Sequence, residues 1–160
     1  MKRIVDHMAK VHMAIMILLY IIVIATVFAQ VIYRYGLKIG LPWSADLALG
    51  AFMWLVFLAT AHGVRDRSHF SVNILPSKLP VPAELAVRTA VAAAMLAALC
   101  ILLIHGSAFT LDSIATFSAA LGISRAWIIA SIPVSAGIAL VYWVAGVRDF
   151  VRIDGEPDAD

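Results

Sequence analysis

Four long stretches of apolar residues alternate with shorter polar stretches along the chain. The apolar stretches predict helices at about residues 13–33, 45–64, 83–104 and 127–147. Each is long enough to cross a bilayer, because a transmembrane helix needs about 20 consecutive apolar residues. The pattern therefore predicts an all-α membrane protein with four transmembrane helices.

The longest polar stretch near the middle of the chain, residues 62–82, separates the helices into two hairpins. Arg65, Arg67 and His69 follow the second apolar stretch, and charges in this position mark where a helix leaves the bilayer core. Further along, apolar and polar residues alternate loosely, and prolines prevent one long helix. We expect a short interfacial segment between helices two and three.

The start of the second helix carries an aromatic and an acidic residue. Trp43 lies where an aromatic anchor is expected at a membrane interface. Ser44 is expected to cap the helix, and Asp46 to lie in its first turn, where a carboxylate meets the positive end of the helix dipole. We therefore expect Asp46 to favour the start of the helix rather than to make a direct functional contact.

Small residues recur at four-residue intervals on the third and fourth predicted helices. They are Ala86, Ala90, Ala94 and Ala98 on the third helix and Ser131, Ser135 and Ala139 on the fourth. Such faces let helices approach closely in lipid. We expect both stripes to contact neighbouring helices. Pro133, near the start of the fourth helix, is expected to bend it or to end its first turn.

The composition agrees with a membrane protein, because 63% of the residues are hydrophobic and only 14% are charged. Residues 1–152 are expected to form one transmembrane domain, and residues 153–160 a flexible acidic tail. The single cysteine excludes an internal disulfide. The first apolar stretch also resembles a secretory signal, but it is long for one.

The basic residues predict the orientation of the helices. Of the 12 Lys and Arg residues, nine lie before the first helix, around the central stretch or after the fourth helix. The other two connections hold only Arg34, Lys38 and Arg125. The positive-inside rule therefore places both termini and the central stretch in the cytoplasm.

Few residues could carry chemistry of their own. A pump or carrier that works alone usually keeps an ionisable or coordinating group at mid-membrane depth, and none is found here. The interior polar residues are Thr26, Gln30, Thr60, Ser131 and Ser135. Motifs for metalloproteases, phosphate loops and serine nucleophiles are missing. We expect a non-catalytic scaffold without a cofactor, a metal or a nucleic-acid partner, rather than a free-standing exporter.

Histidines support one alternative, a haem-b-binding membrane anchor of a redox complex. His12, His62 and His105 lie near the ends of predicted helices. In the predicted topology only His12 and His62 lie on the same side of the membrane, so only these two could share a haem.

Several short motifs, in this order and spacing, resemble the small membrane subunit (DctQ type) of tripartite ATP-independent periplasmic (TRAP) transporters. They are Tyr33-Arg34-Tyr35, Pro42-Trp43 with Asp46, Gly63-Val64-Arg65, His69-Phe70-Ser71-Val72-Asn73, Ala120-Leu121-Gly122-Ile123 before Trp127, and Ile132-Pro133. The family often has two glutamates where Ala45 and Asp46 stand, and Asp where Asn73 stands, which weakens the case for a cation site or a salt bridge there.

The resemblance implies a function that composition alone does not show. It implies a large membrane subunit that carries the substrate and sodium sites, a periplasmic protein that delivers an organic acid anion, and a location in the bacterial inner membrane. The small subunit would scaffold the large one and help dock the binding protein. The residues that we expect at interfaces with these partners or with lipid are Trp43, Asp46, Arg65, His69, Ala90, Ala94, Ala98, Ser131 and Ser135.

Overall fold

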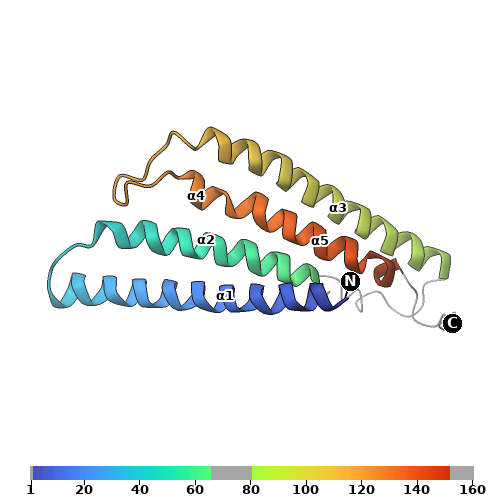
Figure 1. Ribbon diagram of the computed structural model, residues 1–160, viewed down its shortest axis with the longest axis horizontal. Coiled ribbons are helices and arrows are strands. Elements are labelled where there is room, and N and C mark those ends of the chain that lie inside the picture. The colour runs from blue at the N-terminus through green and yellow to red at the C-terminus, as the bar shows by residue number, and fades with distance from the viewer. Residues whose placement is uncertain (1, 66–80, 152–160) are drawn as a thin grey trace.

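The chain folds into long helices in the computed structural model, which describes residues 2–65 and 81–151. The elements are α1 (Lys2–Val31), a π-helical turn η1 (Ile32–Gly36), α2 (Pro42–Arg65), α3 (Val81–Asp112), α4 (Ala126–Ile129) and α5 (Ser131–Val151). Figure 1 shows them as two antiparallel hairpins, α1 with α2 and α3 with α5.

Four of these helical segments are long and apolar enough to cross a membrane. They are Met8–Gly36, Pro42–Arg65, Ala86–Asp112 and Ala126–Gly146. The prediction of a four-span, all-α membrane protein is therefore confirmed. The interfacial segment and His69 lie outside the described residues, as does the acidic tail.

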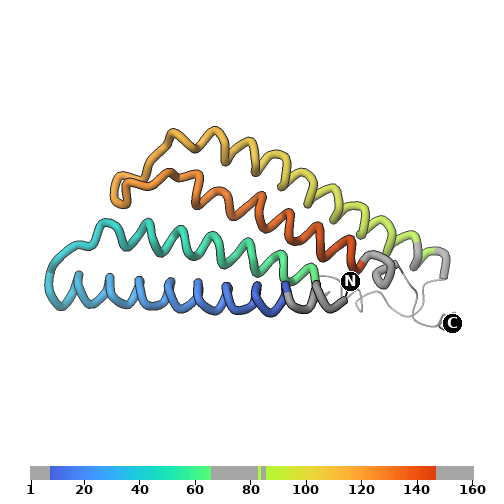
Figure 2. The backbone as a smooth tube through the Cα atoms, viewed as in Figure 1, coloured from blue at the N-terminus to red at the C-terminus, as the bar shows by residue number. Residues whose placement is uncertain are grey.

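The helices lie side by side in a single layer, in the order α1, α2, α5, α3 (Figures 1 and 2). The extensive helix contacts are those of α1 with α2, α2 with α5 and α5 with α3. A layer one helix thick leaves much apolar side-chain surface uncovered on its two faces. This arrangement is compatible with lipid, where covering apolar surface brings no hydrophobic gain.

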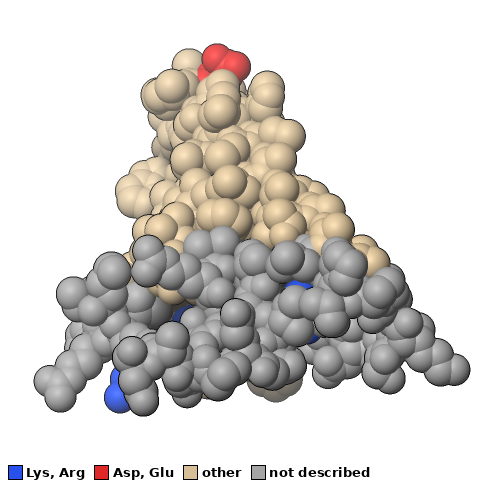
Figure 3. Space-filling model, turned by 90° about the vertical axis from the view of Figure 1, so that its right-hand side faces the viewer, with Lys and Arg blue, Asp and Glu red and all other residues tan. Residues whose placement is uncertain are grey.

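The two ends of the layer differ in the segments they carry. The start of α1 and the end of α5 lie at one end, which we call the terminal end, together with the end of α2 and the start of α3 (Figure 1). The opposite end, which we call the loop end, carries the connections 32–41 and 113–125. Figure 3 views the terminal end, where Lys and Arg lie low in the picture and uncharged residues form most of the described surface above them.

Several helix boundaries differ from the predicted ones; α1, for example, begins at Lys2 rather than near residue 13. α2 begins at Pro42, because proline suits the first turn of a helix and lacks an amide hydrogen to satisfy there. Ser44 is therefore not the cap; it lies inside the first turn, and its hydroxyl donates to the Leu41 carbonyl at 2.6 Å. Asp46 consequently lies beyond the first turn. α3 also extends past the predicted residue 104 to Asp112.

The fourth span begins with a break, as the position of Pro133 predicts. α4 ends at Ile129, and α5 begins at Ser131. Proline has no amide hydrogen to donate to the carbonyl four residues earlier, so the regular hydrogen-bond pattern cannot continue through this point. The prediction of an interrupted first turn is confirmed.

The middle of the layer is packed with small residues. Ala61, Leu99 and Ala139 form a buried cluster from α2, α3 and α5. Nearer the loop end, a Cβ placed on Gly106 would lie 2.8 Å from Cγ2 of Ile132. α3 and α5 therefore approach closely at Gly106, where only glycine leaves enough room.

Candidate functional site

The loop end carries a buried polar contact between distant parts of the chain. Ser118, in the connection 113–125, donates a hydrogen bond from its hydroxyl to Oδ2 of Asp46 on α2. The same hydroxyl oxygen accepts a hydrogen bond from the backbone amide of Leu121 at 3.1 Å. Ser118 is only 3% exposed. Asp46 thus makes a tertiary contact, which corrects our expectation that it mainly favours the helix start.

The connection 113–125 has a defined fold of its own. An isolated antiparallel bridge joins Phe117 to Ser124, and the Arg125 amide donates to the Thr116 carbonyl at 2.7 Å. Gly122 has φ of +67°, in the left-handed region that glycine adopts without strain. The sequence identified this stretch as a connection but gave no sign of this turn.

Apolar side chains project from the loop end. Phe117 is 62% exposed and Trp127 is 68% exposed. Trp54 on α2 donates from its indole nitrogen to the Trp127 carbonyl at 2.9 Å, which ties α2 to α4. Trp43 is also exposed, on the first turn of α2. The loop end therefore exposes apolar and aromatic side chains, and hydrogen bonds hold the backbone that carries them in place.

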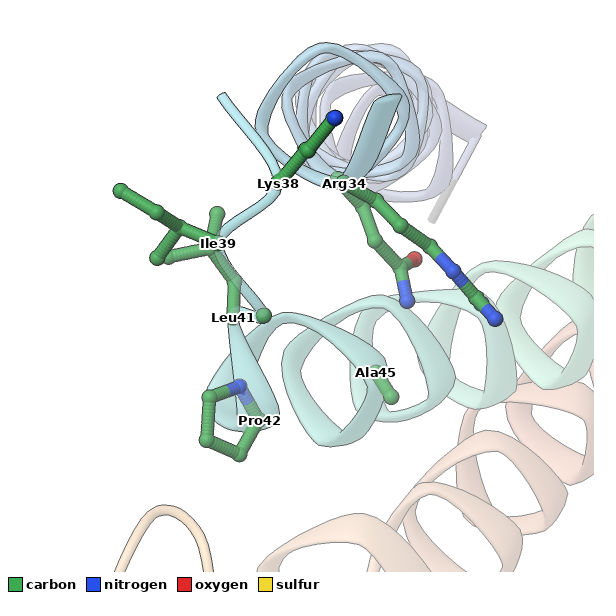
Figure 4. Close-up of a pocket in the computed structure, with 8 residues that line it drawn as sticks. Arg34, Lys38, Ile39, Leu41, Pro42 and Ala45 are labelled. Carbon is green, nitrogen blue, oxygen red and sulfur yellow. The ribbon is translucent and has the colours of Figure 1, made fainter. Parts of the chain in front are cut away.

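A cavity of about 520 Å³ lies at the loop end between α1 and α2 (Figure 4). Its lining residues are Gln30, Arg34, Lys38, Ile39, Gly40, Leu41, Pro42 and Ala45. In Figure 4 the side chain of Arg34 extends from η1 toward α2, and Ala45 lies on α2 below it. From the sequence, Arg34 and Lys38 entered the charge count that sets orientation, and Arg34 a family motif, but neither was expected to line a cavity.

The terminal end brings three aromatic side chains together. Nδ1 of His12 lies 3.3 Å from the Tyr142 hydroxyl, at hydrogen-bond distance. The rings of His12 and His62 meet edge to face, with centroids 5.4 Å apart. His105 lies on α3, near the loop end. The structure thus pairs His12 with His62 as the topology predicts, but this ring contact leaves no room for a haem between them.

The same end holds a second, smaller cavity of about 350 Å³. Arg65, the last residue of α2, lines it together with Lys10 and His62. Arg65 and His69 were both expected at an interface with a partner or with lipid. Arg65 lies at the terminal end of the layer, and His69 lies outside the described residues.

The two small-residue stripes face in different directions. Ala90, Ala94 and Ala98 are exposed, whereas Ala92 on the same helix is 4% exposed and packs inside the layer. Ser131 and Ser135 are 0% and 3% exposed. The serine stripe is therefore buried by contacts within this chain, whereas the alanine stripe is exposed.

Fold and site together define a small, multi-pass membrane protein whose charged groups lie at the ends of its spans. Residues 22–153 match the family described as the DctQ component of tripartite ATP-independent periplasmic transporters. The chain belongs to this family and is a small membrane subunit of a TRAP transporter, which confirms the resemblance read from its motifs.

A curated relative supports this assignment. Over 81 residues the chain is 33% identical to a protein of Haemophilus influenzae named as a TRAP transporter small permease protein. The match covers 51% of this chain and 50% of the relative, so it spans about half the length of each. Neither comparison supports the haem-anchor alternative.

Proposed function

We propose that this chain is a non-catalytic scaffold in a sodium-coupled TRAP transporter for organic acid anions. It holds the large membrane subunit in the bilayer and helps dock the periplasmic binding protein. The observation that carries the proposal is the single-layer arrangement of α1, α2, α5 and α3, which leaves apolar surface uncovered on its broad faces. Such a layer can cover a neighbouring subunit on one face and contact lipid on the other.

The positions of the charges support a scaffold rather than a carrier. Between residues 13 and 33, 47 and 64, 89 and 111, and 126 and 147, the sequence contains no Asp, Glu, Lys or Arg. Ionisable groups inside the membrane mark ion and substrate pathways, because burying them there is costly. The substrate and sodium sites therefore belong to the large subunit.

The orientation follows from the basic residues at each end. Within the described residues, the helix ends at the terminal end carry Lys2, Arg3, Lys10, Arg65, Arg88 and Arg148, whereas the loop end carries Arg34, Lys38 and Arg125. The positive-inside rule therefore turns the terminal end toward the cytoplasm of the bacterium. The loop end then faces the periplasm, where the binding protein approaches. The connection 113–125, whose fold is fixed by hydrogen bonds and whose apolar side chains are exposed, is the surface that we propose for docking the binding protein.

Affinity purification from native membranes tests the proposal. We expect a large membrane subunit to purify with the chain. In proteoliposomes with an inward sodium gradient, uptake of an organic acid anion should require this chain, the large subunit and the binding protein together. Uptake by this chain alone, or purification without any large membrane subunit, would contradict the proposal.

A further inference from the structure

We propose that the cavity between α1 and α2 at the loop end binds the phosphate of a phospholipid headgroup. The site lies wholly within this chain, so the inference goes beyond the proposed transport role. Its volume is about 520 Å³, and its lining combines Arg34 and Lys38 with the amide of Gln30. No acidic residue is among the lining residues, so an anion placed in the cavity meets no repulsive carboxylate there.

The cations are held at the cavity by an irregular backbone. α1 does not end as a regular helix, because Ile32–Gly36 form a π-helical turn that contains Arg34. Such turns are rare and occur frequently at functional sites. Lys38 follows with φ of 57°, an uncommon value for a residue other than glycine. The Ile39 amide donates to the Tyr33 carbonyl at 3.0 Å and fixes this turn against α1.

Arg34 itself is directed across the cavity. It extends toward α2 in Figure 4, and its guanidinium lies 5.9 Å from the ring centre of the adjacent Tyr35. Lys38 also lines the cavity, but its side chain extends away from α2 in Figure 4. A guanidinium with several free donors suits a phosphate better than an ammonium does, because it can bind two oxygens at once. Arg34 is therefore the main ligand, and Lys38 adds charge.

The position of the cavity selects a lipid as the source of that phosphate. It lies where two apolar spans end, at the depth of the headgroups. Tyr35 is 75% exposed and Trp43 is 41% exposed beside it, as expected of aromatic residues at a membrane interface. Ile39 and Leu41 give the cavity an apolar wall for the glycerol and upper acyl carbons.

The test uses the full chain purified with the subunits that accompany it. Native mass spectrometry counts the lipid retained after incubation with palmitoyl-oleoyl phosphatidylglycerol, with the matching diacylglycerol, or with inorganic phosphate. We expect retention of phosphatidylglycerol and no retention of the diacylglycerol, which lacks the phosphate. Arg34→Gln should weaken retention about fivefold, the effect of one basic residue near an anionic lipid.

Two further variants separate the site from general charge. Ala45→Phe fills the cavity but keeps both cations, and should abolish retention. Arg125→Gln removes the third cation of the loop end, which does not line the cavity, and should retain as much lipid as the unchanged chain. If Arg34→Gln does not fold, Ala45→Phe decides the result alone.

Several outcomes would overturn the proposal. Unchanged retention in Ala45→Phe would show that lipid binds elsewhere, and an equal loss in Arg125→Gln would show that only overall charge matters. Absence of retained phosphatidylglycerol in the intact complex would show that the cavity does not bind a phospholipid. Complete displacement of the lipid by an equal concentration of inorganic phosphate would identify a free anion as the ligand instead.

Discussion

The hydroxyl of Ser118 donates a hydrogen bond to the carboxylate of Asp46, although the two residues are 72 positions apart in the sequence. The contact joins α2 to the connection 113–125, which carries the exposed apolar side chains of the loop end. Because the same hydroxyl oxygen accepts from the Leu121 amide, Ser118 fixes both the fold of the connection and its attachment. The Asp46 carboxylate thus has a hydrogen-bond partner within the chain, and its presence at position 46 needs no bound cation as an explanation.

Replacing Ser118 with alanine is expected to loosen the loop end. The substitution leaves Asp46 without its donor and the Leu121 amide without its acceptor, and hydrogen bonds to charged groups contribute about 1.5–3 kcal/mol. Thermal unfolding of the purified protein should show that the free energy of unfolding falls by this amount. Ser107→Ala is the matched control, since Ser107 is exposed and bonds only to its own helix. Equal stability of the two variants would contradict the role of Ser118.

Gly106→Ala is expected to separate α3 from α5 locally. The new methyl group would lie 2.8 Å from Cγ2 of Ile132, and overpacking of this kind typically costs about 1–3 kcal/mol. Gly137→Ala provides the control, because nothing lies within 4 Å of a Cβ there. It should leave stability unchanged or raise it, since alanine favours helix over glycine. Adding Ile132→Ala to Gly106→Ala should cost less than the sum of the two single changes, and strict additivity would contradict the close approach.

The positions of the four spans could be predicted from the sequence, but the order in which they pack could not. Lipid requires each crossing segment to be a long apolar helix, so residue types alone located all four, as well as the break before Pro133. The order α1, α2, α5, α3 depends on which small residues face inward. The pattern could not tell buried Ala92 from exposed Ala94, because both lie in an alanine-rich segment.

The candidate site was harder to predict than the helices, because its contacts join distant segments. Asp46 was interpreted from its neighbours at the helix start, whereas its partner lies in a connection far along the chain. Ser44 was expected to cap α2, but Pro42 already starts the helix. For the cavity a signal did exist in the sequence. Arg34 and Lys38 lie four positions apart in a connection that the count of basic residues predicts to be periplasmic, where cations are disfavoured.

Tyr142→Phe is expected to weaken the terminal end of the layer. Tyr142 is 3% exposed, and its hydroxyl lies at hydrogen-bond distance from the buried His12. Losing this bond should cost about 0.5–1.5 kcal/mol. Tyr20→Phe, on an exposed position of α1, should have no measurable effect. A double-mutant cycle with His12→Ala measures the coupling directly, and a coupling energy of zero would show that the two side chains are merely close.

The orientation can be measured with single cysteines in a Cys100→Ala background. Lys38→Cys at the loop end should react in intact cells whose outer membrane is permeable to a maleimide that cannot cross the inner membrane. Lys10→Cys at the terminal end should react only after the inner membrane is disrupted. Both positions are exposed, so a difference reports the side of the membrane. The reverse pattern would place the termini in the periplasm and refute the orientation derived from the basic residues.

Ala94→Phe and Ala92→Phe distinguish contacts with a partner from contacts within the chain. Ala94 is exposed on α3, so a phenyl ring there should leave the unfolding temperature of the isolated chain unchanged. If the alanine stripe contacts the large subunit, the same ring should weaken that association by about 1–3 kcal/mol, because small residues are needed for close helix approach. Ala92 is 4% exposed, so Ala92→Phe should instead destabilise the chain itself. Co-purification with the large subunit measures the first effect and thermal unfolding the second. Undiminished co-purification of Ala94→Phe would place the partner on another face of the layer.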